Sequence, residues 1–265
     1  MPPATSPLGR ARPHTPLALA GIALALASAV AACTGERPRL ADETSTTEEP
    51  TTTTTEPEPA DAEVAQAKAP SIDVYASEDA DAADRRIESG VDTSAGDTPI
   101  VFLVKGRQEG DARIEVYLPI DPSGSTGWVD ADDVALSEVG YRIEVGMSQH
   151  QLRVYRDDEM ILDEPAGVGC GEGFVPGGVY YLKELLQRPD PDGDYGTYAY
   201  GLSGFANVLE SLDDGTDVTA IHGTNEPDTV GTDVADGCVR LRNEAIERMV
   251  DEIGLPLGTP VEVQA

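Results

Sequence analysis

The segments Tyr141-Arg-Ile-Glu-Val145 and Gln151-Leu-Arg-Val-Tyr155 decide the fold class of the C-terminal half of the chain. In both, apolar and polar residues alternate, as in a strand with one buried face, and the short stretch between them predicts a β-hairpin. Only Arg242–Glu252 has the apolar spacing of a helix. Further strands are expected at 160–168, 178–182, 217–221 and 256–263. Residues 140–265 therefore predict a mainly β domain, a sandwich or barrel with one helix.

A smaller β module is expected before this domain, over residues 70–137. Ile100–Val104 is a continuous apolar run, and Ala112–Ile120 alternates before a stretch of turn-forming residues. The next segment, Gly127-Trp-Val-Asp-Ala-Asp-Asp-Val134, resembles the end of bacterial SH3-like cell-wall modules. Trp128 is interpreted as a core or barrel-rim aromatic, with stacking on a ligand as the alternative.

The N-terminal residues carry an export signature. Arg10 and Arg12 precede the apolar run Leu17–Ala32, which is shorter than the about 20 residues that span a membrane. Its end, Val30-Ala-Ala-Cys33, resembles the bacterial lipobox, whose cysteine is lipidated. We expect residues 1–33 to be a lipoprotein signal, with Cys33 anchoring the protein at the outer face of the bacterial cell membrane. The alternatives are an ordinary signal peptide and an uncleaved anchor.

The composition of the chain limits the partners and cofactors that we expect. Residues 34–69 are rich in Thr, Glu, Pro and Ala, which predicts a disordered linker. The 49 acidic residues outnumber the 18 basic residues, giving a net charge of −31 that argues against binding to nucleic acid. Three cysteines and three histidines argue against a disulfide framework and a zinc site. We expect a monomer with no metal and no cofactor.

The chemically reactive residues lie late in the chain. His222 follows an expected strand, and Cys238 precedes the expected helix. A nearby imidazole or helix N-terminus lowers the pKa of a thiol, and the thiolate is the nucleophilic form of cysteine. Gly237 would let a substrate approach the backbone, where the N–H groups of Gly237 and Cys238 could bind an oxyanion. From these residues alone, a buried cysteine beside a hydrogen-bonded core histidine remains the alternative.

These residues lie in segments that resemble the signature of a known family. Ile221-His-Gly-Thr-Asn and Val234-Ala-Asp-Gly-Cys-Val-Arg-Leu241 resemble the active-site signature of the L,D-transpeptidases with a YkuD-type catalytic domain. Val175-Pro-Gly-Gly-Val-Tyr-Tyr-Leu182 and Tyr198-Ala-Tyr-Gly-Leu-Ser-Gly204 are similar to two further segments of that family. The likeness covers about 140–263, nearly the whole C-terminal domain.

The resemblance implies a role for each matching residue. Cys238 is the expected nucleophile toward the peptide carbonyl of a peptidoglycan tetrapeptide stem. His222 is the expected general base, oriented through its other ring nitrogen by the carbonyl of Gly223. The amine of a second stem would resolve the acyl-enzyme into a 3→3 cross-link. Arg240 is expected to order the active-site loop, and Tyr198 lies in the segment expected on the substrate side.

The sequence departs from the family at the dipeptide before Gly-Cys, where Ala235-Asp236 stands instead of Ser or Thr followed by His. A carboxylate at Asp236 would raise the pKa of Cys238 by repulsion of the thiolate, or it would pair with His222. The alternative function is therefore a catalytically weak or inactive peptidoglycan-binding lipoprotein. A papain-like or NlpC/P60-type peptidase is disfavoured, because its cysteine precedes its histidine in the chain.

Two other features have simpler interpretations. Asp190-x-Asp-Gly-Asp194 has alternating acids, but an EF-hand needs Gly at its sixth place and Glu at its twelfth. Tyr195 and Gly201 stand at those places, so an acidic loop is expected. Cys170 is expected to be an unbridged thiol, with a redox partnership with Cys238 as the alternative.

Overall fold

The computed structural model describes residues 61–89, 98–169, 174–188, 190, 192–205, 219–234 and 239–265. The predicted signal with Cys33, most of the predicted linker, Cys170, and the segment with Asp236, Gly237 and Cys238 lie outside these residues. Within the described part of the chain, no helix has the length and apolar character required to span a membrane.

The N-terminal module is an antiparallel five-stranded sheet. In sheet order its strands are β6 (Thr126–Asp130), β5 (Arg113–Tyr117), β4 (Val101–Gly106), β1 (Ala62–Ala67) and β7 (Val134–Val139). A ribbon of β2 (Ser71–Val74) and β3 (Arg85–Glu88) joins β6 through a bridge between Tyr75 and Trp128. Alternate residues such as Ile114 and Val116 on β5 are buried in the core, as their alternation predicts. The likeness to SH3 modules stays a prediction.

Strand β1 corrects the predicted end of the linker. The linker was expected to extend to residue 69, but Ala62–Ala67 pairs with both β4 and β7. Val64 and Ala65 on this strand are buried. The segment Ala-Glu-Val-Ala-Gln-Ala holds only one large apolar residue, so its composition resembles that of the linker. Its two neighbouring strands make it a central strand of the sheet.

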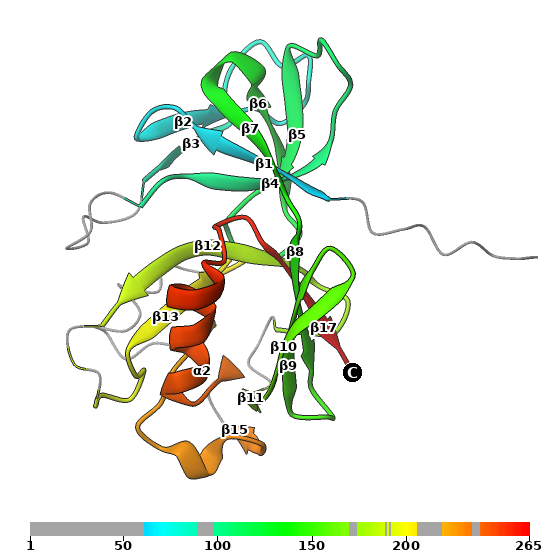
Figure 1. The fold of residues 1–265 in the computed structure, drawn as a ribbon. Helices are drawn as coiled ribbons and strands as arrows, with labels where there is room; N and C mark the ends of the chain where they lie inside the picture. The colour runs from blue at the N-terminus through cyan, green and yellow to red at the C-terminus, as the bar shows by residue number, and fades with distance from the viewer. Residues whose placement is uncertain are drawn as a thin grey trace, which may run out of the picture. The chain divides into compact units, whose positions relative to one another are not determined.

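The C-terminal domain is built on a mixed ten-stranded sheet among the described residues (Figure 1). The predicted hairpin is confirmed as β8 and β9, with Val145 opposite Leu152. The strand expected at 160–168 is two strands, β10 and β11, separated at Ala166. In sheet order the strands are β10 (Glu159–Pro165), β9 (Gln151–Arg156), β8 (Tyr141–Gly146), β17 (Pro260–Gln264), β12 (Val179–Gln187), β13 (Tyr198–Leu202), β14 (Ala220–His222), β16 (Val239–Arg240), β11 (Gly167–Gly169) and β15 (Asp233–Val234).

One helical segment longer than a single turn occurs among the described residues of this domain. It begins as α2 (Asn243–Glu247) and continues as the π-helical segment η3 (Arg248–Ile253), close to the predicted range. Ile246 and Met249 are buried in the core, and α2 contacts β13 and β14. The helix ends at Gly254, whose φ of 69° is the left-handed conformation common after helices. The mainly β fold class is therefore confirmed.

The long strand β12 joins the two sheets. The Tyr181 hydroxyl donates a hydrogen bond to the carbonyl of Tyr117 at 3.0 Å, and the Ser123 hydroxyl donates to the carbonyl of Val179 at 2.7 Å. Tyr181 itself is fully buried. These bonds connect β12 to the last residue of β5 and to the segment between β5 and β6.

Candidate functional site

His222 is the last residue of β14, in the interior of the sheet. Its strand pairs antiparallel with β13 and parallel with β16, so that Ala199 and Arg240 lie opposite His222 on the two sides. The sequence explains the position, because the apolar Ala220 and Ile221 form a short buried strand and Gly223 follows. His222 is 1% exposed.

A hydrogen bond fixes the orientation of the imidazole. The Nδ1 atom of His222 lies 2.5 Å from the carbonyl oxygen of Gly223. A carbonyl oxygen only accepts hydrogen bonds, so Nδ1 carries the proton and Nε2 of the neutral ring can accept one. The contact that the family resemblance implies is present in the structure, and the catalytic roles of His222 and Gly223 stay predictions.

The segment that is predicted to carry the nucleophile lies between β15 and β16 in the chain, and β16 is the strand next to that of His222. β15 ends at Val234 and β16 begins at Val239, and both strands pair with β11. Val239 lies opposite Ile221 in the parallel pair of β16 and β14. Adjacent strands lie about 4.8 Å apart. The residue that follows Cys238 in the chain is therefore on the strand next to that of His222.

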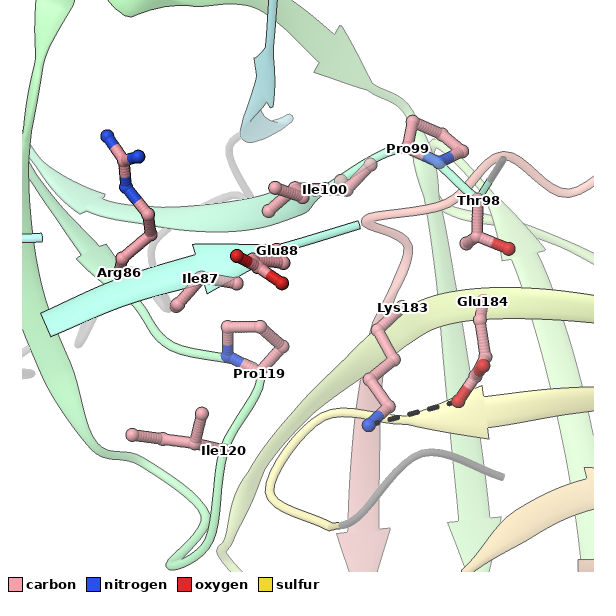
Figure 2. A pocket seen from close by; sticks show the side chains of 11 residues that line it. Arg86, Ile87, Glu88, Thr98, Pro99, Ile100, Pro119, Ile120, Lys183 and Glu184 are labelled. Carbon is pink, nitrogen blue, oxygen red and sulfur yellow. Dashed lines mark ion pairs between the residues drawn. The ribbon is translucent and has the colours of Figure 1, made fainter. Parts of the chain in front are cut away.

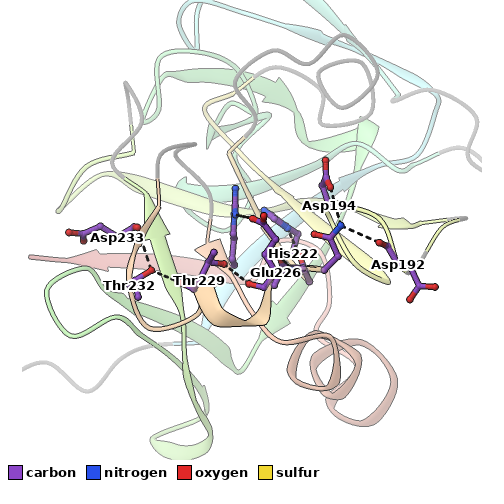
Figure 3. Close-up of polar contacts among 11 residues, drawn as sticks. Asp192, Asp194, His222, Glu226, Thr229, Thr232 and Asp233 are labelled. Atoms are coloured by element: carbon purple, nitrogen blue, oxygen red, sulfur yellow. Dashed lines mark hydrogen bonds and ion pairs between the residues drawn. The ribbon is translucent and has the colours of Figure 1, made fainter.

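Arg240 contacts the loop that follows His222. Its side chain is 16% exposed, and its Nη1 atom lies 3.3 Å from the carboxylate of Glu226. Figure 3 shows the polar contacts of this loop, in which the Thr229 hydroxyl also donates to the carbonyl of Glu226. The predicted role of Arg240 was to order the active-site loop, and the ion pair is the kind of contact that such a role requires.

Tyr198 contacts the His222 loop through its backbone. Its carbonyl accepts the N–H of Gly223 at 3.2 Å, whereas its hydroxyl lies 3.2 Å from the carboxylate of Asp251 on η3. Burial, and then the hydrogen bond to Asp251, raise the pKa of Tyr198 above its usual value. The predicted substrate-side role of Tyr198 stays a prediction.

The acidic loop holds an aromatic residue that was not predicted to be part of the site. The ring of Tyr195 packs against the imidazole of His222, with centroids 4.9 Å apart and planes tilted by 59°. The side-chain amide of Asn225, on the His222 loop, donates to Asp194 Oδ1 at 3.1 Å and to the carbonyl of Asp192 at 3.2 Å (Figure 3). The only sequence signal for Tyr195 was that it breaks a calcium motif.

The acidic loop makes its contacts without a metal-binding arrangement. The carboxylate of Asp190 accepts the backbone N–H of Asp192 at 3.1 Å, which closes a local turn. Across the ranges that the structure describes, no group of three or more His, Cys, Asp or Glu side chains is arranged to hold a metal ion.

A separate cavity of about 260 Å³ lies between the two sheets and contains none of the predicted site residues. Two charged neighbours on β12, Lys183 and Glu184, line one side of it (Figure 2). Lys183 is the extra residue of a bulge in the pairing of β12 with β13. Its Nζ atom lies 3.8 Å from Glu184 and donates to the carbonyl of Phe205 at 2.7 Å. This cavity is therefore separate from the candidate site around His222.

The described residues define a mainly β domain in which a buried histidine ends an inner strand, next to the strand that begins directly after Cys238 in the chain. The family model of the L,D-transpeptidase catalytic domain, YkuD, matches residues 140–263. Residues 140–263 therefore belong to the family of L,D-transpeptidases with a YkuD-type catalytic domain, which confirms the predicted resemblance for this domain.

Several known proteins are similar to this domain. YkuD of Bacillus licheniformis, assigned as an L,D-transpeptidase, is 29% identical over 125 residues, which are 47% of this chain and 66% of that protein. YqjB of Bacillus subtilis, assigned to the same class, is 32% identical over 84 residues, which are 31% of this chain and 42% of that protein. The chain thus spans less than two thirds of the length of the curated relatives that it matches.

Two solved structures are also similar in part. Bd1075 of Bdellovibrio bacteriovorus is 30% identical, with 46% of each chain covered and a TM-score of 0.35. The L,D-transpeptidase of Xylanimonas cellulosilytica is 20% identical, with 47% of this chain and 60% of that chain covered and a TM-score of 0.34.

Proposed function

We propose that the protein is a peptidoglycan L,D-transpeptidase, an acyltransferase that forms 3→3 cross-links through a cysteine acyl-enzyme. The observation that carries the proposal is the hydrogen bond from His222 Nδ1 to the Gly223 carbonyl, within a domain of this family. That bond leaves Nε2 as the nitrogen that can take a proton from a thiol. A histidine held in this tautomer is what a general base for Cys238 requires.

The acylation step transfers one proton and exchanges one bond. Cys238 gives its thiol proton to His222 Nε2, and Sγ bonds to the peptide carbonyl carbon of a tetrapeptide stem. The backbone N–H groups of Gly237 and Cys238 would stabilise the resulting oxyanion. As the C–N bond breaks, the imidazolium returns the proton to the amine of the departing terminal D-residue.

The second step transfers the acyl group to another stem. A side-chain amine of that stem attacks the thioester carbonyl, and His222 accepts the amine proton. The C–S bond breaks, the thiolate regains a proton, and a new amide joins the two stems. The energy of the original peptide bond is retained in the thioester, so the reaction needs no nucleotide.

A second candidate function is a catalytically weak or inactive peptidoglycan-binding protein. The observation that favours it is Asp236, which stands where the family has a histidine before Gly-Cys. A carboxylate next to the thiolate would disfavour the nucleophilic form of Cys238. Replacement by Asp236→His would then increase the rate of acylation, whereas a site adapted to Asp236 would lose activity.

Location follows from the N-terminal motif in this proposal. Lipidation at Cys33 would hold the enzyme at the outer face of the bacterial cell membrane, within reach of peptidoglycan stem peptides. The protein would act there as a monomer. The net charge of −31 supports the proposal that nucleic acid is not a partner.

The decisive experiment is mass spectrometry of the purified protein after incubation with a tetrapeptide-containing muropeptide. An acyl adduct on Cys238, absent from the Cys238→Ala variant, is the expected result. A carbapenem serves as a second acylating probe of the same thiol. Absence of an adduct with both probes would contradict the transpeptidase proposal and favour the inactive relative. An adduct with the carbapenem alone would favour the catalytically weak relative.

A further inference from the structure

The geometry points to Asn243 as a positioning residue for His222, acting through the peptide bond between Gly223 and Thr224. This inference rests on the proposed role of His222 as general base. Asn243 is the first residue of α2 and lies five places after Cys238 in the chain. No sequence pattern marked this residue as part of the site.

The C=O and the N–H of one peptide group each make a hydrogen bond with a side chain. The Gly223 carbonyl accepts the Nδ1 proton of His222, and the N–H of Thr224, which belongs to the same peptide group, donates to Asn243 Oδ1 at 2.9 Å. A trans peptide is planar, and its C=O and N–H point in opposite directions. Holding the N–H therefore fixes the direction of the carbonyl that orients the imidazole.

Close packing restrains the Asn243 side chain itself. A Cβ atom on either Gly196 or Gly223 would overlap with Asn243 Oδ1. The carboxamide oxygen thus lies between the acidic loop and the His222 loop, with backbone on both sides. Neither loop can shift toward it, so the oxygen is a fixed acceptor for the Thr224 N–H.

The same contact affects the proton on the imidazole. When an amide N–H donates a hydrogen bond, the amide becomes more polarised and its carbonyl accepts a stronger hydrogen bond. A stronger acceptor at Gly223 favours the Nδ1–H tautomer and stabilises the imidazolium that forms when Nε2 takes a proton. Asn243 therefore supports His222 through the peptide group between Gly223 and Thr224.

Three variants of the full-length protein separate this role from a general effect on folding. Asn243→Leu keeps a similar volume but removes the acceptor, whereas Asn243→Asp retains an acceptor oxygen. Glu244→Ala changes the exposed neighbour in the first turn of the same helix and is the matched control. Thermal unfolding shows which variants fold, and Asn243→Ser, too short to reach Thr224, replaces the leucine variant if that one does not.

Two readouts test the inference. The ¹⁵N shifts of the His222 ring report its tautomer, with His222→Gln used to assign the signals, and stopped-flow kinetics report the acylation of Cys238 by a carbapenem. Asn243→Leu is expected to mix the two tautomers and to slow acylation about tenfold, as expected for the loss of one hydrogen bond. Asn243→Asp is expected to retain one tautomer and most of the rate, and Glu244→Ala to resemble the wild type.

The result that would overturn the inference is an Asn243→Leu protein with the wild-type ring shifts and acylation rate. Equal losses of acylation rate and of the single ring tautomer in Asn243→Leu and Asn243→Asp would also overturn it. The acceptor oxygen, which only the aspartate variant retains, would then make no difference. If the wild-type protein is not acylated at all, the proposed function fails, while the ring shifts still test the contact.

Discussion

Gly196 crosses Gly223 so closely that a Cβ atom on Gly196 would lie 2.7 Å from the Gly223 backbone. Gly196 also has a φ of 62°, a conformation that side-chain-bearing residues rarely adopt. The crossing holds the acidic loop, which carries Tyr195, against the loop that follows His222. Two loops far apart in the sequence are thus in contact at the histidine.

Replacement of Gly196 by alanine is expected to push these loops apart. The added methyl group overlaps with Asn243 and Gly223, and the positive φ adds strain, so we expect a loss of more than about 1 kcal/mol of unfolding free energy. The acylation rate of Cys238 should also fall. Gly106→Ala is the control, because no atom lies within 4 Å of its added Cβ. Equal denaturation midpoints for the two variants would contradict this prediction.

The ring of Tyr195 is expected to restrain the imidazole of His222. An aromatic pair contributes about 0.5–1.5 kcal/mol, so Tyr195→Ala should slow acylation by up to about tenfold. Tyr195→Phe keeps the ring and should retain most of the rate. Acylation kinetics with a carbapenem measure both variants, and a phenylalanine variant as slow as the alanine variant would show that the hydroxyl, and not the ring, matters.

Two buried tyrosines predict a loss of stability at alkaline pH. Burial raises the pKa of Tyr181 and of Tyr200, with the Asp251 charge as a second cause for Tyr200. The folded pKa values lie above the unfolded value of about 10, so their contribution is complete below pH 10 and is lost as the pH rises toward the folded values. The slope is about 1.4 kcal/mol per pH unit for each tyrosine.

Urea denaturation between pH 8 and pH 11 tests this prediction by comparison of variants. Tyr200→Phe removes a titrating hydroxyl and its 3.3 Å hydrogen bond to the Leu255 carbonyl. The variant should therefore be less stable than the wild type at pH 8, and its unfolding free energy should fall less steeply above pH 10. A pH dependence in Tyr200→Phe as steep as that of the wild type would mean that Tyr200 does not titrate in this range.

The ion pair between Lys183 and Glu184 on β12 predicts that replacing either residue alone strongly lowers the stability of the protein. The side chains of Lys183 and Glu184 are each 7% exposed. Removing one partner of a buried pair leaves the other charge buried, which costs about 3–5 kcal/mol, so Lys183→Met should be strongly destabilising. The double variant Lys183→Met with Glu184→Gln should be less destabilised than the sum of the single variants. Additive losses in denaturation experiments would argue against coupling of the two charges.

The sequence could predict those parts of the fold that depend on local patterns. The alternation in Tyr141–Val145 and Gln151–Tyr155 was sufficient for the hairpin, because one buried face requires alternating residues. The His222 and Arg240 segments were recognised by motif, and the structure pairs the strands that hold them, although no strand was predicted at Arg240. Strand β1 was missed, because its two neighbouring strands, and not its composition, make Ala62–Ala67 a strand.

The supporting residues of the site could not be predicted in this way. Tyr195 reaches His222 because its loop folds back across the sheet, and no periodicity links positions so far apart in the chain. Asn243 looks like an ordinary residue at the start of a helix, and its contact with Thr224 exists only once α2 packs beside β14. Both contacts depend on tertiary packing, which local sequence patterns do not predict.

Strand β17 has a consequence for the order in which the domain forms. Residues Pro260–Gln264 lie between β8 and β12, pairing parallel with one and antiparallel with the other. Until this last segment is in place, β8 and β12 each present an open strand edge, which is a site for pairing with other chains. The domain therefore cannot complete its sheet before Pro260–Gln264 is in place, although every other strand precedes this segment in the chain.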